Sequence, residues 1–115
     1  MSGAQRLMHD TVSLTGTLDL ASADDLQREL FGLIGAGHVN IIVDLSRVQL
    51  CDAAAMRVLV RAGGRCAEEG GWLRLANPVG IVATAFRIVS LGHSVEVYPS
   101  ITAAEAGEPE DLIMR

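Results

Sequence analysis

Three aspartates stand within or at the ends of predicted strands, where a carboxylate could serve in catalysis, metal binding or helix capping. Asp19 follows a half-buried strand, Asp44 lies inside an apolar segment, and Asp52 directly precedes a predicted helix. Acid–base catalysis would require a suitably placed partner group. An aspartate before a helix commonly accepts a first-turn amide, so we interpret Asp52 chiefly as an N-cap for Ala54 or Ala55. We interpret Asp44 chiefly as a residue that binds neighbouring backbone.

The remaining reactive side chains are isolated along the sequence. His9, His38 and His93 lie singly near predicted turns, and Cys51 and Cys66 share no C-x-x-C spacing. No G-x-S-x-G sequence follows a strand, and no G-x-G-x-x-G frame is present. We therefore expect solvated histidines, thiols buried in the core, no cofactor, no metal and no catalytic residue, which makes an enzyme the weakest hypothesis.

The charge pattern excludes several classes of partner and chemistry. The formal net charge is −5, and all nine basic residues are arginines. Nucleic-acid binding requires a clustered basic face, so we expect no nucleic-acid partner. The absence of lysine from the sequence removes Schiff-base chemistry and the phosphate-loop lysine.

The length and hydropathy predict one domain over residues 1–115, with an acidic C-terminal helix or tail at about 101–115. Half the residues are hydrophobic and only 3% are aromatic, so the core must consist of aliphatic side chains. No apolar segment approaches the roughly 20 residues that cross a bilayer, and the N-terminus lacks a signal-like apolar segment. We expect no membrane insertion and a cytoplasmic location.

Alternating and continuous apolar segments predict the strands. We expect strands at 11–15, 40–45, 72–76 and 95–98, with a further short strand near 5–8 paired to the first across a turn. The apolar segment 40–45 is typical of a central strand covered on both faces.

Apolar residues at helical spacing predict the helices between these strands. The first begins at Ser22, which forms a capping-box pattern with Asp25 three residues later, and it ends at Gly35. The second covers 53–69. The third begins at Asn77-Pro78 and ends by Gly92, and a C-terminal helix follows Ser100. Together these elements predict an α/β domain with a mixed central sheet of four to five strands and helices packed against it.

Position 53 raises a specific question, because Ala53 would be the first residue of the second helix. A phosphate at this position would lie over free amides at the positive end of the helix dipole. It would also add about two negative charges beside Asp52 and Asp19. Alanine cannot carry this modification, although it preserves a strong helix start and an uncharged surface.

Four segments resemble the sulfate-transporter and anti-sigma-factor-antagonist (STAS) domain family, specifically the small bacterial anti-sigma factor antagonists. They are GTLD (16–19), VDLSRVQLCDAAAM (43–56), GGWLRLANP (70–78) and LGHSVEVYPS (91–100), in the family's order. The resemblance implies a STAS fold and a partner-switching regulator of transcription. Such a regulator binds an anti-sigma factor, typically an ATP-binding serine kinase of the HATPase type, and thereby releases a sigma factor.

The resemblance also identifies where the chain departs from the family. The family's D-S-[ST]-G-[LIM] motif corresponds here to Asp52, Ala53, Ala54, Ala55 and Met56, so the phosphoacceptor position is Ala53. Asp19 matches the family acid near the phosphorylation loop. We therefore expect a protein–protein interaction through a partner-binding face, formed by Asp19, Asp52, Ala53, Ala54, Met56 and Arg57.

Two functions remain open at this point. In the first, the chain is an anti-sigma factor antagonist that is not switched by phosphorylation at Ala53. In the second, it is a non-phosphorylatable STAS module that serves as a structural or assembly subunit of a transporter or signalling scaffold. Ser46, Ser90 and Ser94 are alternative phosphosites, although turn and cap roles explain their hydroxyls. The sequence does not fix the oligomeric state.

Overall fold

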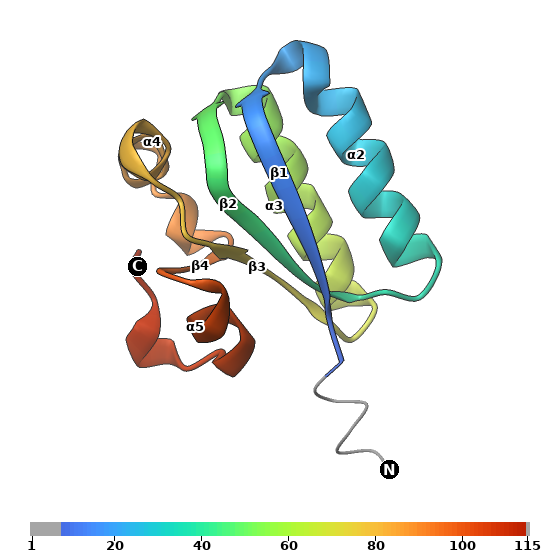
Figure 1. Cartoon of the computed structure of the whole chain (residues 1–115). Coiled ribbons are helices and arrows are strands. Elements are labelled where there is room, and N and C mark those ends of the chain that lie inside the picture. The colour runs from blue at the N-terminus through green and yellow to red at the C-terminus, as the bar shows by residue number, and fades with distance from the viewer. Residues whose placement is uncertain (1–7, 115) are drawn as a thin grey trace.

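The computed structural model describes residues 8–114, which form alternating strands and helices (Figure 1). The described elements, in chain order, are β1 (Asp10–Leu18), α2 (Leu20–Gly35), β2 (Asn40–Cys51), α3 (Ala53–Glu68), β3 (Trp72–Ala76), α4 (Gly80–Ile88), the 3-10 helix η1 (Leu91–His93), β4 (Glu96–Tyr98), α5 (Ile101–Ala106) and the 3-10 helix η2 (Pro109–Asp111). No helix in this part of the chain is long and apolar enough to span a bilayer.

The strands form one sheet in the order β1-β2-β3-β4, and all three pairings are parallel. The predicted α/β class and the helices packed on the sheet are confirmed, whereas the antiparallel pair that the predicted mixed sheet requires is not among the described strands. Four strands are described, and the additional strand predicted near 5–8 falls largely outside the described residues. Strand β2 is central, as predicted, because it pairs with β1 on one side and β3 on the other.

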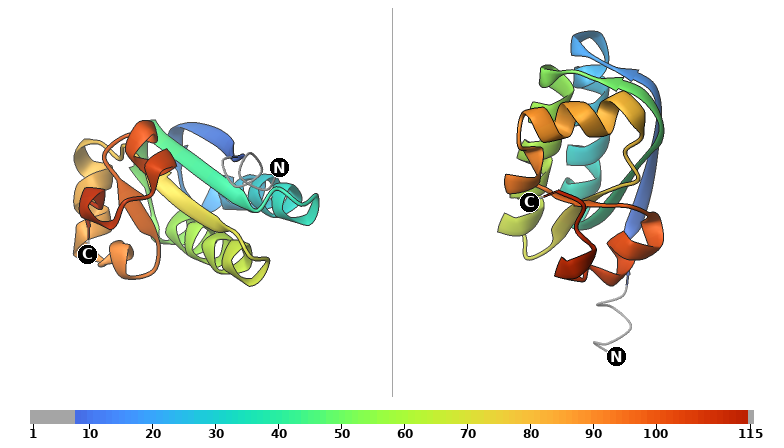
Figure 2. Two further views of the ribbon diagram at one scale, coloured as in Figure 1. Left: turned by 90° about the horizontal axis from the view of Figure 1, so that it is seen from below. Right: turned by 90° about the vertical axis from the view of Figure 1, so that its left-hand side faces the viewer.

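The two faces of the sheet have different coverings. Helices α2 and α3 lie side by side on one face, over a large aliphatic core that also receives α4 (Figure 1). On the opposite face, Ala104 of α5 packs in a small cluster with Ile42, Ala76 and Tyr98 of the sheet (Figure 2). Cys51 and Cys66 are buried in the larger core, which confirms the prediction of core thiols.

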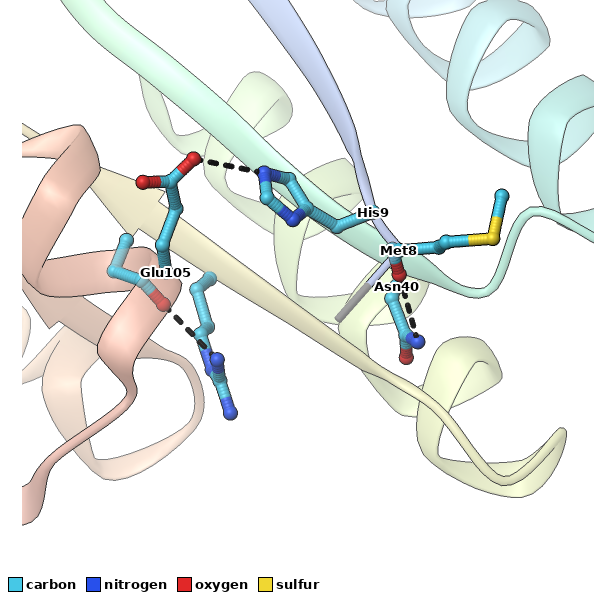
Figure 3. A network of polar contacts seen from close by, with 6 residues as sticks. Met8, His9, Asn40 and Glu105 are labelled. Carbon is cyan, nitrogen blue, oxygen red and sulfur yellow. Dashed lines mark hydrogen bonds and ion pairs between the residues drawn. The ribbon is translucent and has the colours of Figure 1, made fainter. Parts of the chain in front are cut away.

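Polar contacts hold α5 on its face of the sheet. The Arg74 guanidinium lies 3.8 Å from the centroid of the Trp72 ring, and its Nη1 donates to the carbonyl of Ala104 at 2.9 Å. His9 points toward Glu105 of α5, with Nε2 3.1 Å from the carboxylate (Figure 3). The prediction of a solvated turn histidine is therefore wrong for His9, because the imidazole packs near Trp72 and is only 19% exposed.

Two predicted strands are longer in the structure. Strand β2 continues six residues beyond Leu45, because β1 remains paired with it through two register shifts as far as Leu18 and Cys51. Gly16, which follows the strand predicted at 11–15, lies within β1 at φ +79°, next to one of these irregularities. The extension of β2 brings the strand directly to Asp52.

Two predicted helix starts are wrong. Helix α2 begins at Leu20, where Asp19 and Ser22 form a reciprocal capping box, so Ser22 occupies the third helical position. Helix α4 begins at Gly80 after Val79, and no side chain caps it. Asn77 is not its N-cap, because the helix start places Val79 in that position and Asn77 adopts φ +56° instead of the extended backbone of an N-cap; its amide donates to the carbonyl of Tyr98 at 2.8 Å.

Candidate functional site

The site predicted from the sequence lies where β1 and β2 end and α2 and α3 begin. The amide of Asp52 donates to the carbonyl of Leu18 at 2.9 Å, which ties the two strand ends together. Helix α3 begins at Ala53, as predicted, and Ala53 is exposed. The parallel pairing of β1 and β2 places both helix starts at the same edge of the sheet.

Asp52 connects the two helix starts through both of its carboxylate oxygens. Oδ1 accepts the amide of Ala55 at 3.1 Å, which confirms the predicted N-cap. Oδ2 accepts the amide of Leu20, the first residue of α2, also at 3.1 Å. Neither oxygen is therefore a free ligand, and Asp52 acts as a positioning residue that holds the first turns of α2 and α3 together.

Asp19 and Asp44 also bind backbone. Asp19 Oδ1 accepts the amide of Ser22 at 3.1 Å, while the Ser22 hydroxyl accepts the amide of Asp19 at 2.9 Å. Asp44 Oδ1 accepts the amide of Ser46 at 3.0 Å, which confirms its predicted backbone role. Asp19 therefore organises the start of α2, whereas Asp44 holds backbone within β2, away from this edge of the sheet.

The thiol beside the site remains protonated. Burial, with a smaller contribution from the Asp52 carboxylate, raises the pKa of the Cys51 thiol to about 12. A nucleophilic cysteine requires a thiolate near neutral pH. Among residues 8–114, no three His, Cys, Asp or Glu side chains come together in a group that could hold a metal ion.

Exposed apolar side chains lie beside the start of α3. Leu20 at the start of α2 is 76% exposed, and Leu50 near the end of β2 is 43% exposed. Ala53 follows Leu50 at the start of α3 and is exposed, and Ala54 is half-buried. Exposed apolar side chains that gather at one edge of a domain are typical of a protein-binding surface.

A groove extends from Ala53 along α3. Its volume is about 410 Å³, and one wall consists of α3 residues while the other consists of residues that follow α4. The lining residues are Ala53, Met56, Arg57, Val60, Arg61, Val89, Leu91 and Ser94. Three predicted binding residues, Ala53, Met56 and Arg57, therefore line this groove, although Met56 is only 8% exposed.

The other predicted binding residues lie outside the groove, since Asp19, Asp52 and Ala54 do not line it. Sequence reasoning missed the far wall, formed by Val89, Leu91 and Ser94. Helical spacing from Ala53 through Arg57 to Val60 and Arg61 marks one face of α3 and was the available signal for the near wall. No local pattern could identify the far wall, because it is at least 28 residues away from the near wall in the sequence.

The described residues form a small α/β domain with a parallel sheet, and the starts of α2 and α3 lie at one edge of that sheet. The chain belongs to the family described as Mlab, STAS domain, whose sequence model matches residues 2–99. The family resemblance expected from the sequence is confirmed. No curated protein matches the sequence at a significant level.

Solved structures share this fold at low sequence identity. A proposed anti-sigma factor antagonist from Thermotoga maritima is 23% identical, with a TM-score of 0.76 over 84% of this chain and 86% of that chain. A sulfate transporter family protein from Wolinella succinogenes is 22% identical, with a TM-score of 0.71 over 85% and 82%. The Bacillus cell fate determinant SpoIIAA, in its phosphorylated form, is 18% identical, with a TM-score of 0.63 over 85% and 89%.

Proposed function

We propose that the chain is an anti-sigma factor antagonist that binds an anti-sigma factor of the serine-kinase type and releases a sigma factor. The binding face includes Asp19, Asp52, Ala53, Ala54, Met56 and Arg57. The observation that carries the proposal is the exposed Ala53 at the start of α3, held beside exposed Leu20 by the two hydrogen bonds of Asp52. SpoIIAA, a structural neighbour, is itself described as an anti-sigma factor antagonist.

The proposal includes the loss of one mode of regulation. Position 53 corresponds to the family's phosphoacceptor, and alanine has no hydroxyl to accept a phosphate. The binding face therefore keeps the same charge when ATP is present. Control by the amount of protein, or by another site, would replace control by phosphorylation at this helix start.

Affinity purification of the tagged protein from its host, with ATP present, tests the binding face. We expect the parent chain to retain a kinase-type anti-sigma protein that mass spectrometry can identify. Ala53→Asp should lose this protein, because the new carboxylate would have to be desolvated at the interface beside Asp52. Ala53→Asn is the matched control, since it adds nearly the same volume without charge and should retain more of the partner.

A gain-of-function variant tests the kinase part of the proposal. Ala53→Ser places a hydroxyl at the phosphoacceptor position, and serine is tolerated at a helix start. Incubation with the captured partner and ATP should add one phosphate to Ala53→Ser and none to the parent, as measured by intact mass. If Ala53→Ser remains unmodified by a partner that hydrolyses ATP, the kinase assignment is wrong.

The second candidate is a structural or assembly module of a transporter or scaffold. The observation that favours it is the likeness to a sulfate transporter family protein, combined with the missing phosphoacceptor. Under this function, the parent and Ala53→Asp would retain the same transporter or scaffold subunits. That result would replace the first proposal with the second.

A further inference from the structure

The groove along α3 combines an apolar floor with basic side chains. Ala53, Met56, Val60, Val89 and Leu91 supply the apolar lining. Arg57 and Arg61 line the same groove, and both are exposed. This positive charge is notable in a chain whose formal net charge is −5.

The two arginines have no acidic partner within residues 8–114. Arg57 and Arg61 form none of the described ion pairs, whereas Arg28, Arg65 and Arg74 each pair with a carboxylate. Arg61 donates from Nη2 to the neutral Gln27 amide oxygen at 2.6 Å. Among the described residues Asp52 forms no ion pair with either arginine, and its two oxygens accept backbone amides.

The spacing of the lining residues matches a helical ligand. Positions 53, 57 and 61 differ by four, so they follow one face of α3 over about 12 Å, or roughly two helical turns. Side chains four residues apart on a helix lie about 5–6 Å apart at their bases. Two carboxylates four residues apart on a helix packed along α3 would have the same separation as Arg57 and Arg61.

We propose that this groove binds an acidic amphipathic helix, whose apolar face packs on Met56, Val60 and Val89 and whose carboxylates pair with Arg57 and Arg61. Helices bind apolar grooves through side chains at i, i+3, i+4 and i+7, and charge complementarity selects among them. This inference deepens the proposed function, because it specifies the chemistry of the partner segment that contacts the Ala53 face.

Synthetic helical peptides test the proposal without the natural partner. The first is a peptide of about 14 residues with leucines at i, i+3, i+4 and i+7 and two glutamates, four residues apart, beside them. The second has lysines in place of both glutamates. Binding to the ¹⁵N-labelled full chain is followed by amide chemical shifts.

We expect the glutamate peptide to shift the amides of Met56, Val60, Val89 and Leu91 and to bind about tenfold more tightly than the lysine peptide. The double variant Arg57→Ala/Arg61→Ala should lose this preference. The charge-reversed variant Arg57→Glu/Arg61→Glu should prefer the lysine peptide. Both arginines are exposed, so the spectra of the variants without peptide should retain the parent's dispersion.

Three results would overturn the proposal: equal binding of the two peptides, shifts confined to residues outside the groove, or concentration-dependent self-association that the arginine variants abolish. The last result would identify a second copy of the chain as the occupant. These outcomes are separate from the proposed function. If both peptides fail while Ala53→Asp still loses a captured anti-sigma protein, only the groove assignment fails; if the peptides bind as expected and no such protein is captured, only the proposed function fails.

Discussion

The two faces of the sheet are stabilised in different ways. On the face covered by α2 and α3, aliphatic side chains from every described strand pack against the helices, and Leu30, Leu45 and Leu59 are fully buried. On the other face, the buried cluster has four residues, of which Ala104 belongs to the six-residue α5 and the other three to the sheet beneath it. Arg74 and the His9–Glu105 pair provide much of that attachment through polar contacts. The candidate site is therefore built on the face with the larger core.

The start of α3 is held more rigidly than the start of α5, which suits it to a binding surface. The start of α3 is fixed by Asp52 and by the core beneath Ala55 and Leu59, both of which are 0% exposed. The start of α5 rests on one Ser100 cap and a small cluster. Binding surfaces held by rigid elements lose less conformational freedom on association.

Truncation of a buried side chain in each core should produce the largest difference in the free energy of unfolding. Leu59→Ala should lower the free energy of unfolding by about 2–5 kcal/mol, because it leaves a cavity within the larger core. Ile42→Ala, on the α5 side, should cost less, because fewer buried neighbours surround the lost atoms. Urea unfolding measures both. A greater loss for Ile42→Ala would show that the small cluster contributes more than its size indicates.

Alkaline pH should produce the second-largest effect, a loss of folding stability that arises from the thiols in the larger core. Burial raises the pKa of the Cys51 and Cys66 thiols to about 12 and about 11, whereas the same thiols in the unfolded chain titrate at 9.0. Above pH 9.0 the unfolded chain therefore releases protons that the folded chain retains, and stability falls as pH rises from 9.0 toward 12.

Chemical denaturation across this pH range measures the effect. The double variant Cys51→Ala/Cys66→Ala is the matched control and should show a shallower decline above pH 9.0. An equally steep decline in the double variant would assign the alkaline loss to other groups, such as Tyr98, whose pKa is also raised mainly by burial.

Removal of the Asp52 carboxylate, which caps both α2 and α3, should have an intermediate effect on the free energy of unfolding. Asp52→Ala should cost about 1–2 kcal/mol, because the amides of Ala55 and Leu20 both lose their acceptor. The stability of Asp52→Asn should fall between those of Asp52→Ala and the parent, since the NH2 group that replaces one carboxylate oxygen cannot accept an amide. Thermal unfolding provides the measurement. Equal stability of Asp52→Asn and the parent would contradict the assignment of two accepted amides.

A glycine substitution tests how α5 is attached. Gly107 ends α5 at φ +66°, and a Cβ there would lie 2.7 Å from the Arg74 guanidinium. Gly107→Ala should cost about 1 kcal/mol and increase hydrogen exchange in α5. Gly32→Ala is the control, because Gly32 is helical with open space around it, and it should stabilise by about 0.5–1 kcal/mol.

The smallest effect should come from the exposed part of the α5 attachment. Glu105→Gln removes the charge that pairs with His9, and the Glu105 side chain is 46% exposed. Such pairs contribute about 0–1 kcal/mol, so we expect a loss below about 0.5 kcal/mol that added salt reduces further. A loss comparable to that of Gly107→Ala would show that this pair controls the docking of α5.

The sequence alone was enough to predict the element order, the α/β class, the bounds of β3, the start of α3 and the capping role of Asp52. These features depend on local periodicity and on helix-start chemistry within a few residues. It did not determine the length of β2, the start of α4 or the position of His9. Pairing with β1, the Asn77–Tyr98 hydrogen bond and packing near Trp72 set these features, and all three involve residues distant in the sequence.

The residues of the candidate site also fall into two groups, those predicted from the sequence and those that only the fold brings together. The sequence identified Ala53, Met56 and Arg57 because they follow a recognisable motif on one helix. Only the tertiary structure joined them to Val89 and Leu91 in a groove, and only it showed that Asp52 also caps α2. The physical reason is that helix capping and amphipathic spacing act within one or two turns, whereas a groove needs two elements that the sheet brings together.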